Sequence, residues 1–173
     1  MIMMIMMRLE LLLLVSALTG CIQAQSKTVF DLSRLFGARN NEPLTKLLDR
    51  NLPEVQQLID RTKETCLEKL DMPPSQRSLM RVTSPSEQEK LLIECVLKGI
   101  KIMDSSSNRL NLHRVQELTS MVTDDNKLAM AVSSSMAQNC NRSILTKSSS
   151  EAAHQLNQCI SRQLERNMIQ LSW

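Results

Sequence analysis

Apolar residues recur at helical spacing along most of the chain after residue 52. Between Pro53 and Leu70, residues such as Val55 and Ile59 fall on one face of a helix. Pro53 suits a first helical position, because the N–H that proline lacks needs no partner there. Two prolines at positions 73 and 74 end the pattern, because proline cannot continue the hydrogen-bond ladder. The pattern therefore predicts a first long helix over 53–70.

Four later stretches show the same periodicity. A helix is predicted after Ser84, with this serine as the cap, Pro85 in the first turn and Glu87 three residues beyond the cap. Further helices are predicted over 112–122, from Asp124 to about residue 139, and from Ser150 to about residue 164. Short additional helices are predicted near 43–49 and 76–81.

The composition favours helices over sheets. Only two glycines follow residue 24, the chain has no tyrosine and two phenylalanines, and leucine is abundant. The predicted fold is therefore all-α, a compact bundle of about six helices in one domain.

The first residues are typical of a secretory leader. An apolar run from Leu11 to Ile22 is too short to span a bilayer and precedes a small residue, Ala24. This predicts a signal peptide over 1–24, an N-terminal extension over 25–52, and a helical domain with an apolar C-terminal tail over 53–173. The alternative is a bacterial lipobox at residues 18–21, in which Cys21 is lipidated and retained.

Four cysteines remain once the leader is set aside: Cys66, Cys95, Cys140 and Cys159. Their wide separation disfavours a zinc site, which uses closely spaced pairs. An even cysteine count behind a secretory leader predicts two disulfides in an exported domain. Three pairings of the four remain open at this point.

Charge and motifs disfavour several classes of function. The net charge of +3 is small and dispersed, which argues against nucleic-acid binding. The sequence has no Gly-x-Ser-x-Gly, no glycine-rich phosphate loop and no His-Glu-x-x-His. The serines at 133–135 fall within a predicted helix and are interpreted as surface residues. We therefore predict no enzymatic activity, no catalytic residues, no metal and no cofactor.

Two segments carry a resemblance to a known family. Residues 89–98 (Glu-Lys-Leu-Leu-Ile-Glu-Cys-Val-Leu-Lys) and 150–159 (Ser-Glu-Ala-Ala-His-Gln-Leu-Asn-Gln-Cys) resemble helices of the insect pheromone/general-odorant-binding proteins. The full family has six cysteines, and here Leu91 and Ser150 stand where the second and fifth would be. Those two cysteines bond to each other in the family, so their joint absence matches its four-cysteine "minus-C" type.

The resemblance covers about residues 53–164 and has structural implications. It implies disulfides Cys66–Cys95 and Cys140–Cys159, and an apolar cavity inside the bundle. Without a bond between positions 91 and 150, we expect that cavity to be more adaptable than in a six-cysteine relative.

The resemblance also implies a function. The chain would be a secreted carrier of a small hydrophobic molecule (an odorant, a pheromone or a lipid-like compound) in extracellular fluid, with olfaction as one setting and a membrane receptor as a further candidate partner. The scarcity of aromatic residues favours aliphatic ligands. From helical phase and analogy, the predicted ligand-binding residues are Leu92, Val96, Leu118, Met121, Val132, Met136, Leu156 and Trp173.

Three points stay open in the sequence. The tail residues Ile169, Leu171 and Trp173 form either a lid over the cavity or a frayed terminus. His113 and His154 are interpreted as solvent-facing or capping residues, with acid-triggered loosening as the alternative. Asn141 begins a glycosylation sequon. The alternative function is a secreted helical signalling protein that resembles a short cytokine, with a solidly packed interior.

Overall fold

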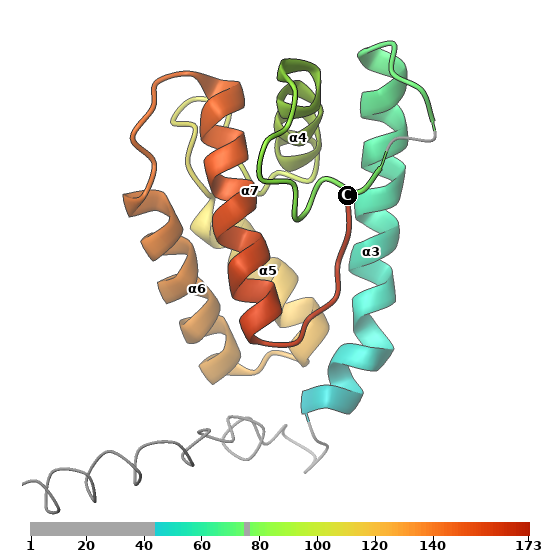
Figure 1. Cartoon of the computed structure of the whole chain (residues 1–173). Helices are drawn as coiled ribbons and strands as arrows, with labels where there is room; N and C mark the ends of the chain where they lie inside the picture. Colours follow the sequence, from blue (N-terminus) through green and yellow to red (C-terminus); the bar gives the residue numbers. More distant parts are fainter. Residues whose placement is uncertain (1–43, 75–76) are drawn as a thin grey trace, which may run out of the picture. The chain divides into compact units, whose positions relative to one another are not determined.

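Five α-helices make up the regular structure of the part of the chain that a computed structural model describes, residues 44–74 and 77–173. They are α3 (Leu44–Lys69), α4 (Glu87–Gly99), α5 (Leu112–Thr123), α6 (Lys127–Arg142) and α7 (Ser149–Arg166) (Figure 1). The all-α prediction is confirmed, with five helices here against the six expected. The predicted signal peptide, Cys21 and most of the predicted extension lie outside the described residues.

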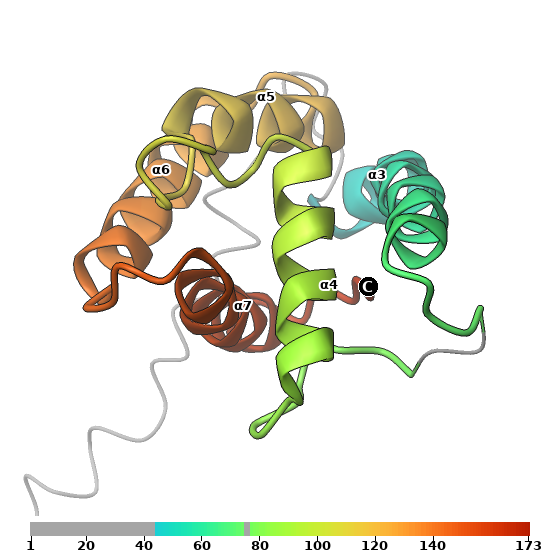
Figure 2. The same cartoon turned by 90° about the horizontal axis from the view of Figure 1, so that it is seen from above.

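The helices form a closed ring. α3 packs against α4, α4 against α7, α7 against α6, α6 against α5, and α5 against α3. Figure 2 looks onto this ring and shows the C-terminal end of the chain lying among α3, α4 and α7. Each helix thus turns one face toward a common interior, where the buried apolar side chains of the domain gather.

The first helix is longer than the sequence predicts. α3 runs without a break through Pro53, so the short helix predicted near 43–49 and the helix predicted from residue 53 are one element. Proline costs a helix one hydrogen bond, but the apolar face of α3, with Leu47, Val55 and Ile59 buried, keeps the element continuous. The predicted domain border at 52/53 falls inside this helix.

The start of α4 differs from the prediction by two residues. Ser86, not Ser84, is the N-cap: its side chain accepts the Glu89 N–H at 3.2 Å, and the Glu89 carboxylate accepts the Ser86 N–H at 2.8 Å. Arg77 donates to the same carboxylate at 2.9 Å, and together these bonds lower the pKa of Glu89 to about 2. The predicted helix over 76–81 is wrong for the residues described there, which are non-helical.

The predicted helices toward the C-terminus are confirmed with shifted starts. α6 begins after Asn126, whose side chain accepts the Ala129 N–H at 3.0 Å. Asp124 and Asp125, predicted to open this helix, instead have φ values of 52° and 58° and form the turn between α5 and α6. Short polar side chains tolerate this left-handed region better than most residues. α7 begins at Ser149, one residue before its predicted start.

The disulfide pairing that the resemblance implied is confirmed. Cys66–Cys95 joins α3 to α4, and Cys140–Cys159 joins α6 to α7. Two of the five contacts in the ring of helices are therefore covalent.

Polar side chains join α4 to the start of α7, in the region where the third disulfide of six-cysteine relatives would lie. Lys90 pairs with Glu151 at 2.8 Å. Lys98 donates to Glu94 at 2.7 Å and to Ser149 at 2.8 Å, and Ser149 donates to Glu94 at 2.6 Å. We call these five residues the α4–α7 polar cluster. They connect the two helices without a covalent bond.

Among the helices of the described residues, none combines the length and the apolar character needed to cross a membrane.

Candidate functional site

The interior of the ring is one apolar cluster, to which α3, α4, α5, α6 and α7 all contribute. Five of the eight predicted ligand-binding residues lie in it, all nearly inaccessible to solvent: Leu92, Val96, Leu118, Leu156 and Trp173. The prediction thus located an apolar interior, and the residues there define the candidate site.

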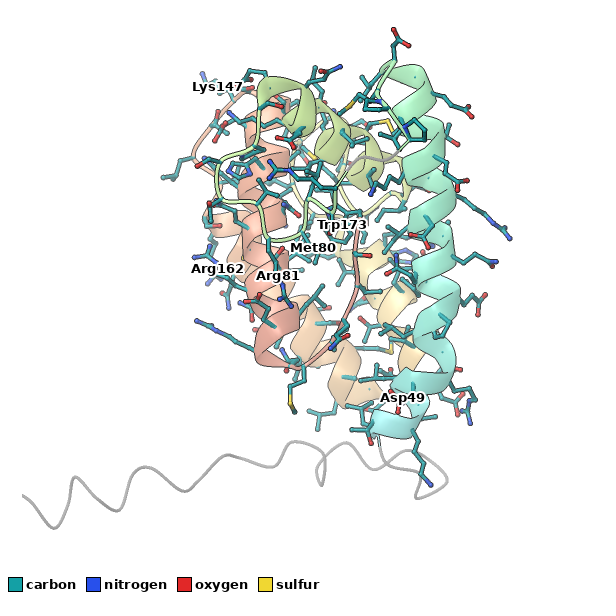
Figure 3. All side chains as sticks on the ribbon, turned by 45° about the vertical axis from the view of Figure 1, so that its right-hand side comes forward. Asp49, Met80, Arg81, Lys147, Arg162 and Trp173 are labelled. Atoms are coloured by element: carbon teal, nitrogen blue, oxygen red, sulfur yellow. A yellow bond between two sulfur atoms is a disulfide. The ribbon has the colours of Figure 1, made fainter. Side chains whose placement is uncertain are left out.

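Trp173 belongs to this interior although it is the last residue of the sequence. After α7 the chain turns back between α7 and α3 (Figure 1) and brings the indole, 3 % exposed, next to Met80 (Figure 3). The tail (residues 167–173) is therefore ordered against the helices. Of the two alternatives from the sequence, a frayed terminus is wrong for Trp173.

Three hydrogen bonds between distant parts of the chain hold the tail in place. Gln56 on α3 donates to the Ser172 carbonyl at 2.7 Å and accepts the Ser172 N–H at 3.0 Å. The Leu79 N–H donates to the Trp173 carbonyl at 2.6 Å. All three bonds involve backbone atoms of the tail. α3 and the segment before α4 therefore position the tail independently of its side chains.

Asn157 supplies the polar centre of the site. Its side chain on α7 is fully buried; its Oδ1 accepts the Trp173 indole N–H at 2.9 Å, and its Nδ2 donates to the Leu79 carbonyl at 2.8 Å. Ser161, one turn further along α7, donates to the Met80 carbonyl. α7 thus binds both the tail and the segment before α4 through buried polar side chains.

His154 is the titratable group nearest in sequence to this centre. It is buried on α7, and its Nδ1 has no hydrogen-bond partner among the described residues. Burial lowers the pKa of His154, against the attraction of Glu151. His113 is exposed on α5 and pairs with Glu117 at 3.1 Å. The two histidines therefore differ: the solvent-facing interpretation holds for His113 and is wrong for His154.

The structure does not bring the other three predicted ligand-binding residues into the apolar cluster. Met121 is 42 % exposed, and Val132 and Met136 are partly exposed on α6. α6 turns Ala129, Ala137 and Cys140 inward instead, as the disulfide from Cys140 to α7 requires.

Sequence reasoning missed Asn157 and Gln56. Asn157 could have been found, because it lies four residues after Ala153 and shares the buried face of α7. Gln56 carries no such signal, since its role depends on where the tail runs.

Two hollows open to solvent lie outside this interior. One, of about 830 Å³, follows α3 and α4 beside the Cys66–Cys95 disulfide and is lined in part by Thr62, Leu91 and Gly99. The other, of about 440 Å³, lies beside the tail at Met168 and Ile169. None of the eight predicted ligand-binding residues lines either hollow.

Asn141 has a structural role in addition to its sequon. Its Oδ1 accepts the Leu110 N–H at 2.6 Å, and its Nδ2 donates to the Leu110 carbonyl at 3.0 Å. A glycan on Nδ2 would compete with this pairing, and occupancy stays a prediction.

No group of histidine, cysteine, aspartate and glutamate side chains in the described ranges is arranged to hold a metal ion. The interior combines packed apolar side chains with a few buried polar groups, the kinds of side chain that also line pockets for small hydrophobic molecules. The internal cavity that the resemblance implied stays a prediction.

Comparison with known proteins agrees with this geometry. The family model described as PBP/GOBP family matches residues 49–163. The chain belongs to the PBP/GOBP family. A solved structure, odorant-binding protein dmelOBP28a from Drosophila melanogaster, is similar in fold: it aligns with a TM-score of 0.52 at 15 % identity, and the alignment covers 68 % of this chain and 98 % of that chain. No curated protein sequence matches the chain. The family resemblance is confirmed, and the four-cysteine subtype stays a prediction.

Proposed function

We propose that this chain is a secreted carrier that encloses a small hydrophobic molecule in the interior of its helix ring, and that the tail is the movable part of that site. The observation that carries the proposal is Trp173. Its indole is buried in the apolar cluster although it comes from the segment after α7 and not from a helix.

This origin matters for ligand entry. Helix side chains leave the interior only if a helix moves, whereas α3, α4 and α7 are held by disulfides or by the α4–α7 polar cluster. The tail is held by hydrogen bonds with Gln56, Leu79 and Asn157 and by burial of its indole, without a covalent bond to a helix. The tail therefore leaves at a lower free-energy cost than any helix.

A ligand that displaces the indole must offset the free energy that burial of the indole contributes. A tryptophan buries about 200 Å² of surface, which corresponds to about 5 kcal/mol. At about 0.8 kcal/mol for each buried CH₂, an aliphatic chain of about six carbons or more offsets that loss. Aliphatic molecules of moderate length are thus the expected cargo, as the scarcity of aromatic residues also indicates.

Family membership and the confirmed disulfides support the extracellular setting. Disulfides form and persist in oxidising compartments, in agreement with the leader predicted over 1–24.

Uptake of a fluorescent hydrophobic probe, N-phenyl-1-naphthylamine, tests the proposal. We expect the folded protein to bind the probe, aliphatic competitors to displace it, and the emission of Trp173, the only tryptophan of the chain, to change on binding. The variant Trp173→Ala should bind the probe several-fold more tightly, because no side chain competes for the interior. Met168→Ala is the matched control on the same tail, since Met168 is 89 % exposed.

The proposal fails if wild type and Trp173→Ala both keep their helical circular dichroism and take up no probe. That result would favour the solid bundle of a signalling protein. If the probe binds and the emission of Trp173 stays unchanged, the interior site stands and the role of the tail is refuted.

A further inference from the structure

The buried amide of Asn157 has a fixed orientation. The Trp173 indole N–H can only donate a hydrogen bond, so it must face Oδ1; the Leu79 carbonyl can only accept, so it must face Nδ2. A flipped amide would place two donors and two acceptors against each other. The network therefore assigns the oxygen of Asn157 to the position that Trp173 occupies.

Removal of the indole leaves one particular polar atom unpaired. The hydrogen bond from Nδ2 to the Leu79 carbonyl remains, because it does not involve the side chain of Trp173. Oδ1 loses its donor on a side chain that has no solvent exposure in the folded chain. Leaving a buried acceptor without a donor is costly, whereas a replacement donor removes most of the cost.

On this basis, and resting on the proposed function, we propose that Asn157 selects ligands that bring a hydrogen-bond donor, and that the preferred class is the aliphatic alcohols. The indole N–H stands in for the hydroxyl of the ligand. An ester, an aldehyde, an ether or a carboxylate offers only acceptor oxygens, which would face Oδ1 with like partial charge. A hydrocarbon would leave Oδ1 unpaired.

The expected discrimination is about tenfold. An unpaired buried acceptor lowers affinity by a factor of about five to a hundred, and the lower half of that range applies where water reaches the site. Methylation of a hydroxyl is the cleanest comparison, since it adds one carbon of apolar area yet removes the donor.

Competition against bound N-phenyl-1-naphthylamine measures this directly, with 1-dodecanol, 1-methoxydodecane and dodecane as competitors. Wild type should bind the alcohol about ten times more tightly than the methyl ether. Asn157→Leu should bind both about equally, whereas Asn139→Leu, an exposed asparagine on α6, should keep the wild-type ratio.

Trp173→Phe provides a second variant that does not depend on Asn157 being replaceable. Phenylalanine keeps an aromatic ring on the tail but has no N–H, so Oδ1 is unpaired in the closed form. Affinities for the alcohol and for the ether should then rise by the same factor, because only the ligand-free closed form loses a hydrogen bond, and the roughly tenfold preference for the alcohol should stay.

The outcomes separate the two proposals. Absence of probe uptake refutes the carrier function itself. Probe uptake with equal affinities for alcohol and ether, or with tighter binding of the ether, leaves the carrier function standing and overturns the role of Asn157.

Discussion

Glu89 joins the start of α4 to the segment that holds the tail, so its charge should matter for stability. Its carboxylate accepts the Ser86 N–H and the Arg77 side chain, and Arg77 lies two residues before Leu79. The change Glu89→Gln removes the charge but keeps a side chain able to form a capping box. The variant therefore isolates the electrostatic part of this contact.

The magnitude follows from the pKa of Glu89. The hydrogen bond from Arg77, and after it the one from Ser86, lower that pKa from 4.5 to about 2. This difference corresponds to at most about 3 kcal/mol of stability at neutral pH. Arg77 is 61 % exposed and its pairing is screened by water and salt, so we expect Glu89→Gln to lower the free energy of unfolding by about 1–2 kcal/mol.

The sign of the pH dependence is also fixed. Because the folded protein binds this proton less readily than the unfolded chain, the stabilisation is complete above pH 4.5 and is lost as the pH falls toward 2. The difference between Glu89→Gln and wild type should therefore shrink by more than half between pH 7 and pH 3.

Urea unfolding followed by far-UV circular dichroism at pH 7, 4 and 3 measures both effects. Glu87→Gln is the matched control: it removes the same charge from the same helical turn, but its carboxylate is exposed and pairs only with Lys90 in the described structure. We expect a loss of about 0.5 kcal/mol or less for this control. Equal losses for the two variants, or a difference that does not change with pH, would refute the reasoning.

Three further predictions concern other parts of the ring. Burial lowers the pKa of His154, so the folded protein should lose stability as the pH falls below about 6.5, and unfolding titrations of His154→Gln should show a flatter slope there; an unchanged slope would contradict this. A Cβ at Gly99 would lie 2.4 Å from Cγ2 of Thr62, so Gly99→Ala should lower the thermal unfolding midpoint by an amount equivalent to about 1–2 kcal/mol. Adding Thr62→Ala should restore much of this loss, and a double variant no more stable than Gly99→Ala would contradict the reasoning. Replacing both Cys140 and Cys159 with alanine, measured in urea, should cost about 3 kcal/mol, since the bridge spans 19 residues, and a loss below 1 kcal/mol would show that α6 and α7 are held mainly by packing.

Most of the fold could be predicted from the sequence, because the helical periodicity and the cysteine positions are consistent with one arrangement of helices. Periodicity located α4 to α7 within a few residues, and the family resemblance supplied the cysteine pairing that joins the helices. The exact start of α4 was harder to predict, because two serines could each cap the helix. Ser84 precedes Glu87 by three residues, and Ser86 precedes Glu89 by three. In the structure Glu89 also accepts a hydrogen bond from Arg77, and this contact favours Ser86 as the cap.

Only part of the candidate site could be predicted from the sequence. Leu92, Val96 and Leu156 lie on faces that periodicity defines, and they are buried together. On α6, Val132 and Met136 follow the same spacing of four as Cys140, but the structure buries Ala129, Ala137 and Cys140 and leaves Val132 and Met136 partly exposed. The burial of Trp173 has no local cause, because it depends on contacts across 16 and 94 residues of chain.

The α4–α7 polar cluster connects two helices of the ring through ion pairs and hydrogen bonds, whereas the two disulfides connect helices covalently. A sulfur bridge has the same strength in dilute and concentrated salt, whereas the attraction between Lys90 and Glu151 weakens as mobile ions accumulate around it. The ease with which α4 and α7 separate is thus set partly by the medium that bathes the protein. A carrier built this way would be stiffer in a fluid poor in electrolytes and more compliant in one rich in them, without any change in its covalent structure.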